Sequence, residues 1–366
     1  MPTLSSPTAP LHSAAAALAS TLPQLEAWLA RQAGVAPAAG LAALVDAGLG
    51  QPPLPGSGAT LQRWQMLAAV AGHDLGLAKL VEGHTDALAI LAELDGPVPE
   101  PGSLWGVWCA EGPGVLQAMP AEARAGRGDP AALRLSGRKA WCSGAAGLSH
   151  ALVSCRDAAN RPLLAAVTLA QPGVDITDDG WRAVGMAASA SVDVRFDNAS
   201  AFQVGQPGAY VARPGFWHGG AGIAACWYGA ARALGLALHR RQHAAASTTN
   251  TDIADDPHRL AQLGRIDVAL AGAAALLREA AATIDREPGA DAMALALRTR
   301  LAVEAVATDV LQLASRALGA GPLCRDAWFA QMAADLPVFL RQSHAERDQA
   351  ALGARLAAQE AAPWPL

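Results

Sequence analysis

The segment Lys139-Ala-Trp-Cys-Ser-Gly144 combines residue types that could hold a cofactor. The indole of Trp141 offers a flat apolar face on which a planar ring can lie. The hydroxyl of Ser143 and the neighbouring backbone N–H groups can hydrogen-bond polar atoms at the edge of such a ring. This pattern indicates a site for a heteroaromatic cofactor. A tryptophan in a β core beside a turn serine is the alternative interpretation.

Short runs with strand-like composition surround this segment. The runs span residues 104–110, 133–140, 151–155, 163–169 and 191–196. In the last run, Val192, Val194 and Phe196 fall on one face and polar residues on the other, which is typical of a half-buried strand. Glycine, proline, asparagine and aspartate separate the runs. The spacing predicts a small antiparallel barrel or sandwich over residues 101–208.

Ala/Leu-rich segments with helical spacing lie on both sides of the strands. Residues 1–100 predict an N-terminal helical domain, in which Leu22, Leu25 and Leu29 recur at i, i+3 and i+7. Segments near 222–246, 258–285, 291–318 and 325–357 predict an antiparallel four-helix bundle over residues 209–366. The sequence therefore predicts a mainly α protein with a β insert. It does not predict a doubly wound α/β fold, because no Gly-x-Gly-x-x-Gly follows a strand.

Composition and charge exclude several classes of protein. The chain has 366 residues, of which 52% are hydrophobic and 16% charged, which favours large buried helix surfaces and an oligomer interface. A net charge of −5 gives no basic surface for nucleic acid. The five scattered cysteines predict neither a disulfide framework nor a metal site. We also expect a cytoplasmic protein without a membrane span, because the N-terminus lacks a basic n-region and no apolar run reaches roughly 18–20 residues.

Three segments resemble the middle domain of the acyl-CoA dehydrogenase family of flavoproteins. They are residues 139–144, Trp181-Arg-Ala-Val-Gly-Met186 and Val194-Arg-Phe-Asp197. In that family a Lys-x-Trp-x-Thr/Ser-Asn-Gly turn lies against the flavin, and the order of domains is the same as here. The resemblance implies FAD as the cofactor, with Trp141, Cys142 and Ser143 at its ring.

Other segments resemble the family more weakly. The run Trp108-Cys-Ala-Glu-Gly-Pro-Gly114 is similar to a Thr-Glu-Pro-Gly-x-Gly segment at the flavin and substrate sites, which implies contacts from Glu111 and Gly112. Ala110 replaces the usual hydroxyl donor. Gly112 and Gly114 making only a tight turn is the alternative interpretation.

The C-terminal half resembles the segments that bind the distant part of FAD. Arg241 falls near the family's Arg-x-Gln-Phe-Gly, whose arginine reaches the FAD pyrophosphate of a neighbouring subunit. Arg316, Gly319 and Gly321 fall on the family's Gln-x-x-Gly-Gly-x-Gly turn at the adenosine end. The resemblance implies a homodimer or homotetramer that shares its cofactor. A solvated basic helix face around Arg241 is equally compatible with the sequence.

The catalytic glutamate of the family is not found. Acyl-CoA dehydrogenases use it to remove an α-proton from the acyl thioester while a hydride passes to flavin N5. Alignment on Asp335 places Ser343 or His344 at that position. The alternative position of the glutamate, near residues 217–220, has no carboxylate either. Glu346 becomes the base only if the register shifts.

Flavin monooxygenases of the same fold carry a histidine at this end of the bundle. In them reduced flavin activates dioxygen, and a His/Ser pair near N5 moves protons. Ser143 and His344 match that pair, and histidine titrates near neutrality. The alternative is that His344 lies on a solvated helix face and pairs with Asp348.

Three functions therefore remain. We favour an FAD-dependent acyl-CoA dehydrogenase-like oxidoreductase acting on an acyl thioester, because the flavin-side motif is its closest match. The alternatives are a reduced-flavin monooxygenase acting on another small molecule and a non-catalytic flavin- or acyl-binding member of the fold.

Overall fold

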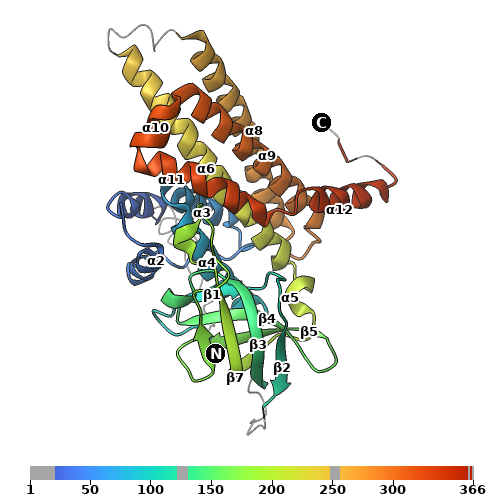
Figure 1. Cartoon of the computed structure of the whole chain (residues 1–366). Helices are drawn as coiled ribbons and strands as arrows, with labels where there is room; N and C mark the ends of the chain where they lie inside the picture. The colour runs from blue at the N-terminus through green and yellow to red at the C-terminus, as the bar shows by residue number, and fades with distance from the viewer. Residues whose placement is uncertain (1–20, 122–130, 248–255, 362, 365–366) are drawn as a thin grey trace, which may run out of the picture.

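The computed structural model describes residues 21–121, 131–247, 256–361 and 363–364. The N-terminal residues 1–20, on which the expectation of no signal peptide rested, lie outside this part. Figure 1 shows the β-strands at one end of the molecule and the long helices at the other. The core that joins them is continuous, because buried side chains of the first helices, the strands and the bundle form one cluster.

The N-terminal helices follow the predicted apolar spacing. Residues 21–29 are helical, and three further helices follow. These are α2 (Pro37–Asp46), α3 (Thr60–His73) and α4 (Leu75–Glu93). Leu25 and Leu29 are buried as expected, whereas Leu22 is only partly buried. Helix α4 begins where the carboxylate of Asp74 accepts a hydrogen bond from the backbone N–H of Leu77.

Seven strands of the described residues form one closed sheet. They are β1 (Trp105–Trp108), β2 (Leu116–Pro120), β3 (Ala132–Cys142), β4 (His150–Arg156), β5 (Pro162–Thr168), β6 (Val174–Ile176) and β7 (Val192–Val204). The order is β1-β4-β2-β3-β7-β5, and β4 also pairs with β5, which closes a barrel. The expectation of an antiparallel sheet was wrong in part, because β1 and β2 both pair with β4 in parallel.

The C-terminal part contains three long helices and one interrupted region. Short α5 (Ala209–Ala212) leads into α6 (Gly215–Ala246), which is followed by α8 (Pro257–Arg286) and α9 (Met293–Leu318). The single helix predicted over 325–357 is wrong. The chain there forms α10 (Ala320–Arg325), α11 (Ala327–Phe339), the 3-10 turn η3 (Leu340–Gln342) and α12 (Glu346–Ala357). Pro337 lies near the end of α11, and Ala345 takes a left-handed φ of 44°, so the helix cannot continue.

Two helices in the described part of the chain are long and apolar enough to cross a membrane by length and composition alone. In α6, 72% of the most apolar stretch of 18 residues is buried inside the protein, which is typical of a core helix. Helix α8 lies on the outside of the bundle, and only 17% of its most apolar stretch of 18 residues is buried. Its exposed side therefore includes apolar residues such as Leu260 and Val268.

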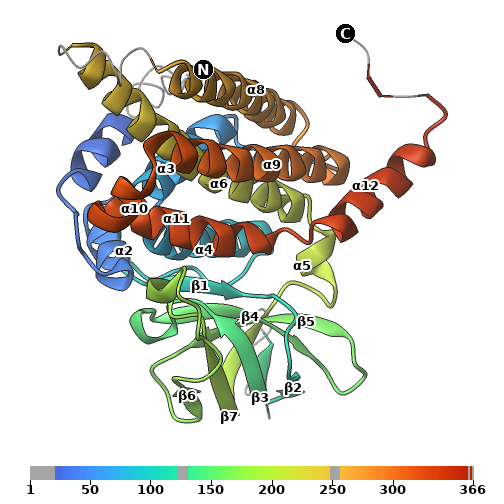
Figure 2. The ribbon, with the colours of Figure 1, turned by 45° about the horizontal axis from the view of Figure 1, so that its top comes forward.

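Helix α4 connects the sheet to the bundle. It packs against β1 on one side and against α3 and α6 on the other (Figure 2). Gly144, directly after β3, lies so close to α4 that a Cβ there would be 2.5 Å from Cδ2 of Leu80. The turn that contains Ser143 is therefore held against a rigid helix.

Candidate functional site

Trp141 presents its indole to solvent at the end of β3. Its side chain is 45% exposed, whereas Ala140 and Cys142 beside it are buried. The register of β3 against β7 shifts between Lys139 and Cys142, and Trp141 has a left-handed φ of 59°. This irregularity turns the indole outward. An exposed tryptophan held in a strained backbone conformation is typical of a binding site.

The segment containing Gly112 lies beside that indole. A Cβ on Gly112 would be 3.3 Å from the Trp141 ring and 3.1 Å from the Ala140 methyl group, so a larger residue would crowd the indole. The adjacent Glu111 is exposed and pairs with Arg156, with 3.3 Å between Oε1 and Nη2. The structure thus places Gly112 beside Trp141, with Glu111 exposed next to it.

Ser143 is half-buried and anchored from both sides. Its carbonyl accepts a hydrogen bond of 3.2 Å from the indole N–H of Trp108. Its hydroxyl lies 2.7 Å from the hydroxyl of Ser191. This fixed hydroxyl next to an exposed indole is the pair of groups that the sequence predicted at the edge and face of a planar ring.

Cys142 offers such a ring only its backbone. Its side chain is fully buried, and its thiol donates to the carbonyl of Lys139. Burial raises the pKa of this thiol, so it stays protonated at neutral pH. Lys139 is also buried, and its ammonium donates a 2.7 Å hydrogen bond to the hydroxyl of Ser154.

His344 lies on the connection between η3 and α12. Its side chain is 57% exposed, with Nδ1 3.5 Å from Oδ1 of Asp348, so the predicted pairing with Asp348 is present. The backbone N–H of His344 donates to the same carboxylate. Ser343 is buried, and Glu346 is exposed in the first turn of α12. No described contact joins His344 to Ser143, so the structure does not bring the expected pair together directly.

Arg300 holds this connection against the start of α6. Its guanidinium donates to the carbonyl of Gly220 on α6 and to the carbonyl of Gln342 in η3, at 2.9 Å each. The guanidinium also lies over the Trp227 ring, 5.2 Å from its centroid. The His344 segment is therefore tethered to the first turns of α6, near the alternative position of the family's glutamate.

Asp86 is a candidate residue that the sequence did not reveal. This half-buried carboxylate of α4 faces α6, where a Cβ on Gly219 would be 2.7 Å from its Oδ1. Among the described residues Oδ1 has no hydrogen-bond partner. Burial raises the pKa of Asp86, and Arg213 partly opposes that effect. The sequence signal was a polar face on an apolar helix, with Lys79, Glu82 and Asp86 three and four residues apart.

The residues expected at the distant part of the cofactor lie elsewhere. Arg241 is near the C-terminal end of α6, and Arg316, Gly319 and Gly321 are at the turn from α9 to α10. In Figure 1 both places are at the end of the bundle away from the strands. Within one chain they are separate from Trp141.

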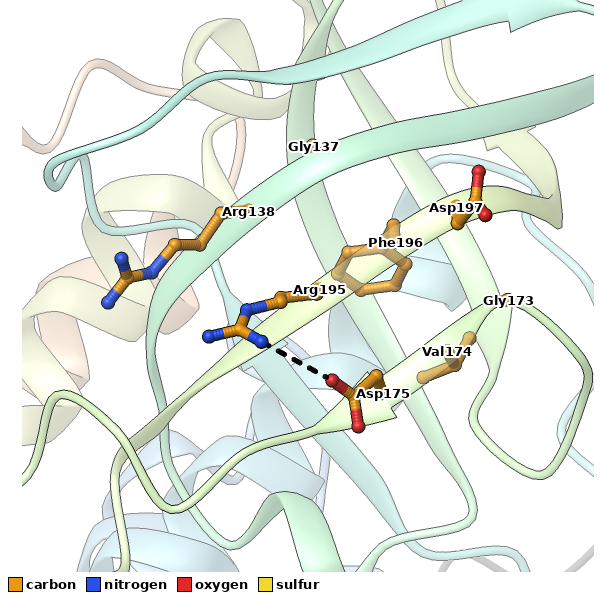
Figure 3. A pocket seen from close by; sticks show the side chains of 8 residues that line it. All are labelled: Gly137, Arg138, Gly173, Val174, Asp175, Arg195, Phe196 and Asp197. Atoms are coloured by element: carbon orange, nitrogen blue, oxygen red, sulfur yellow. Dashed lines mark ion pairs between the residues drawn. The ribbon is translucent and has the colours of Figure 1, made fainter.

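A shallow hollow on the barrel is a different feature. It measures about 610 Å³ and is lined by residues of β3, β6 and β7, with Arg138 and Arg195 side by side (Figure 3). Arg195 pairs with Asp175 and Asp179, and Arg138 pairs with Asp193. Neither Trp141 nor Ser143 lines it. Because its arginines are already neutralised, it offers no free charge for an anionic cofactor.

The residues around Trp141 fit a flavin ring. The indole supplies an apolar face, and the Ser143 hydroxyl supplies a hydrogen-bonding group. Gly112 leaves the space beside the indole open, because any side chain there would crowd the ring of Trp141. Gly114 has a φ of 102°, a backbone conformation that favours glycine in this loop. No group of three or more His, Cys, Asp or Glu side chains that could hold a metal occurs in the described part of the chain.

Comparison with known proteins supports the architecture. Residues 206–340 match the family model described as the acyl-CoA dehydrogenase C-terminal domain. No curated protein matches the chain by sequence.

Solved structures extend the likeness to nearly the whole chain. The dibenzothiophene monooxygenase TdsC from Paenibacillus sp. A11-2 matches with a TM-score of 0.75 at 19% identity, over 96% of this chain and 99% of that chain. The methanesulfinate monooxygenase MsuC from Pseudomonas fluorescens matches with a TM-score of 0.73 at 20% identity, over 95% and 98%. XiaF from Streptomyces sp., solved in complex with FADH2, matches with a TM-score of 0.73 at 16% identity, over 96% and 99%.

These matches confirm the predicted mainly α fold with a β insert. TdsC has also been solved with bound FMN, so the neighbours include one structure with FMN and one with FADH2. At such low identity the likeness shows the fold and leaves the reaction open. The chain has the acyl-CoA dehydrogenase-like fold, and its residues 206–340 match the model of the acyl-CoA dehydrogenase C-terminal domain.

Proposed function

We propose that this protein is a monooxygenase that uses reduced flavin, the alternative to the acyl-CoA dehydrogenase favoured by the sequence motif. The observation that carries the proposal is the exposed indole of Trp141 beside the fixed hydroxyl of Ser143. His344 lies on the connection from η3 to α12. Of the two carboxylates in the first turn of α12, Glu346 is exposed and Asp348 pairs with His344. The monooxygenase neighbours support the same choice.

The flavin ring would lie on Trp141, with Ser143 at N5 and the backbone of Gly112 at its rim. FMN and FAD both fit this placement. FAD would in addition reach Arg241 and the turn at Gly319 of a second copy, which makes a homodimer or homotetramer part of the proposal. When bound, the reduced flavin supplies two electrons for the activation of dioxygen.

The chain's own residues then have separate roles. Trp141 excludes water from one face of the ring, because its indole is apolar. Ser143 holds a hydrogen bond at the ring edge. His344 takes up or releases the proton of the substrate, and Asp348 orients its imidazole through Nδ1. The substrate is a small molecule, and we expect the protein to act in the cytoplasm.

A specific observation keeps a second function in view. Desaturation of an acyl thioester needs a carboxylate of raised pKa near the α-carbon. Asp86 is such a carboxylate, and it faces Gly219 at the start of α6. Asp86 would then remove the α-proton in place of the missing glutamate.

Two variants of the flavin-loaded protein separate these functions. His344→Gln and Asp86→Asn are compared for flavin-dependent oxygen consumption and for anaerobic bleaching of oxidised flavin by a panel of acyl-CoAs. Loss of productive oxygen use in His344→Gln alone supports the monooxygenase. Bleaching that disappears in Asp86→Asn supports the dehydrogenase. A protein that binds flavin in neither redox state would leave only the non-catalytic role.

A further inference from the structure

Three serine hydroxyls form a chain behind the flavin-facing turn. Ser143 Oγ lies 2.7 Å from Ser191 Oγ, and Ser191 Oγ lies 2.9 Å from Ser189 Oγ. Ser189 Oγ donates to the carbonyl of Met186 at 2.8 Å. Ser189 and Ser191 are buried, with 1% and 5% of their surface exposed. The two residues are therefore isolated from solvent, so their hydroxyl hydrogens must form hydrogen bonds within this row of serines.

The far end of this chain sets the direction of its hydrogen bonds. A carbonyl can only accept, so the hydrogen of Ser189 is used on Met186. A hydroxyl has one hydrogen, so Ser189 accepts from Ser191, and Ser191 in turn accepts from Ser143. The hydrogen of Ser143 then points into the protein. What Ser143 presents at the site is a lone pair, which makes it an acceptor.

The two redox states of a flavin differ at the atom that Ser143 would face. N5 of oxidised flavin accepts a hydrogen bond, whereas N5 of reduced flavin carries a hydrogen and donates. A reduced flavin adds one hydrogen bond to the chain without disturbing it. An oxidised flavin gains a hydrogen bond from Ser143 only if at least the Ser143 hydroxyl turns, which gives up one of the three hydrogen bonds that link Ser143, Ser191, Ser189 and Met186.

We infer that Ser189 and Ser191 are positioning residues that hold Ser143 as a hydrogen-bond acceptor and so make the site selective for reduced over oxidised flavin. This inference depends on the proposed placement of flavin N5 at Ser143. The difference between the two states is one neutral hydrogen bond, which corresponds to about tenfold in affinity. For the two-electron couple a tenfold ratio equals about 30 mV in the potential of the bound flavin.

The test is an anaerobic titration of the protein with FMN, in oxidised and in dithionite-reduced form, which gives two dissociation constants per variant. In Ser191→Ala or Ser189→Ala the Ser143 hydrogen becomes free to turn outward. We expect oxidised FMN to bind about tenfold more tightly in both variants, with reduced FMN unchanged. In Ser143→Ala we expect the opposite pattern, with reduced FMN about tenfold weaker and oxidised FMN unchanged.

A matched control lies on the same strand as the turn. Ser136 is exposed on β3, and its hydroxyl accepts from the backbone N–H of Asn198 away from the chain of serines. Ser136→Ala should leave both dissociation constants unchanged. Thermal unfolding of each variant confirms that the fold is intact.

The outcomes separate the two levels of the proposal. Equal weakening of both redox states in Ser189→Ala and Ser191→Ala would show a scaffolding role and overturn the inference, while the flavin site itself would stand. A wild-type protein that binds neither form of FMN or FAD would overturn the proposed function, and the inference with it.

Discussion

Gly185 of the barrel faces the carbonyl of Ala334 on α11 so closely that a Cβ on Gly185 would be 2.0 Å from the carbonyl oxygen. The next residue, Met186, donates its backbone N–H to the carboxylate of Asp335, which also accepts from the amide of Gln331. The backbone at Gly185 therefore packs directly against the backbone of α11 where the barrel contacts the bundle. Met186 is also the residue whose carbonyl ends the chain of serine hydroxyls. The packing of two parts of the fold therefore sets the position of the candidate site.

Gly185→Ala should destabilise the protein. The added methyl group must displace the backbone of α11, and overpacking of this kind costs about 1–3 kcal/mol. Gly264→Ala is the matched control, because Gly264 lies in α8 with no atom near its missing Cβ. That change should stabilise the protein by about 0.5–1 kcal/mol through helix propensity. Denaturant unfolding measures both, and equal free energies for the two variants would contradict the packing argument.

Trp141→Ala should weaken flavin binding and leave the stability of the fold nearly unchanged. The indole is 45% exposed and lies outside the buried core, so its removal opens no core cavity, but it removes the apolar face on which the ring would lie. Trp364, exposed near the C-terminus, provides a control at which alanine should change neither property. Fluorescence titration with FMN measures the effect. Full retention of flavin by Trp141→Ala would show that the ring lies elsewhere.

His344→Gln should slow turnover by about 10²-fold or more, the scale of a lost general acid or base. Flavin binding should be unchanged, because His344 is exposed and pairs only with Asp348 among the described contacts of its side chain. Asp348→Asn should give a smaller loss, because the imidazole remains but is less well oriented. A wild-type rate for His344→Gln would show that His344 is a surface residue that takes no part in proton transfer.

His84 should make the fold sensitive to acid. Burial lowers the pKa of its imidazole from 6.5 to about 4, and its Nδ1 accepts a hydrogen bond from the backbone N–H of Trp105. Because the pKa is lower in the folded state, the stabilisation is complete above pH 6.5 and disappears as the pH falls to about 4. The loss amounts to roughly 3 kcal/mol of unfolding free energy.

The variant His84→Asn separates this effect from other acid-sensitive groups. Asparagine can still accept the hydrogen bond from Trp105 but does not titrate. The difference in unfolding free energy between wild type and variant should therefore shrink or reverse between pH 7 and pH 4. A constant difference over this range would show that His84 does not titrate in the folded state.

Hydrophobic periodicity predicted the elements whose own residues decide their structure. The alternation of Val192, Val194 and Phe196 marked β7, and the apolar spacing marked the three long bundle helices. Strand β6 was missed because its three residues are too few for a clear alternation, and β2 was missed because it ends in Pro120, a residue disfavoured in strands. The parallel pairing of β1 with β4 depends on the closure of the barrel, which no local pattern records.

The candidate site divides in the same way. Trp141 and Ser143 could be proposed from the sequence because one local motif, residues 139–144, carries both, and Gly112 because it lies in a second segment, residues 108–114; in the structure Gly112 lies beside Trp141. The break before α12 was missed, because the run through Pro337 keeps an Ala/Leu-rich composition and the tether from Arg300 is a contact between distant segments. Asp86 was missed for a similar reason. Its partner in space, Gly219, lies on another helix, and only the folded chain brings the two together.

An anaerobic titration of the wild-type protein with reduced and oxidised FMN tests the central claim most directly. The account predicts that reduced FMN binds with the lower dissociation constant, by about tenfold, and that no acyl-CoA bleaches the oxidised complex. Preferential binding of oxidised flavin, together with bleaching by a thioester, would contradict the monooxygenase and identify the protein as a dehydrogenase.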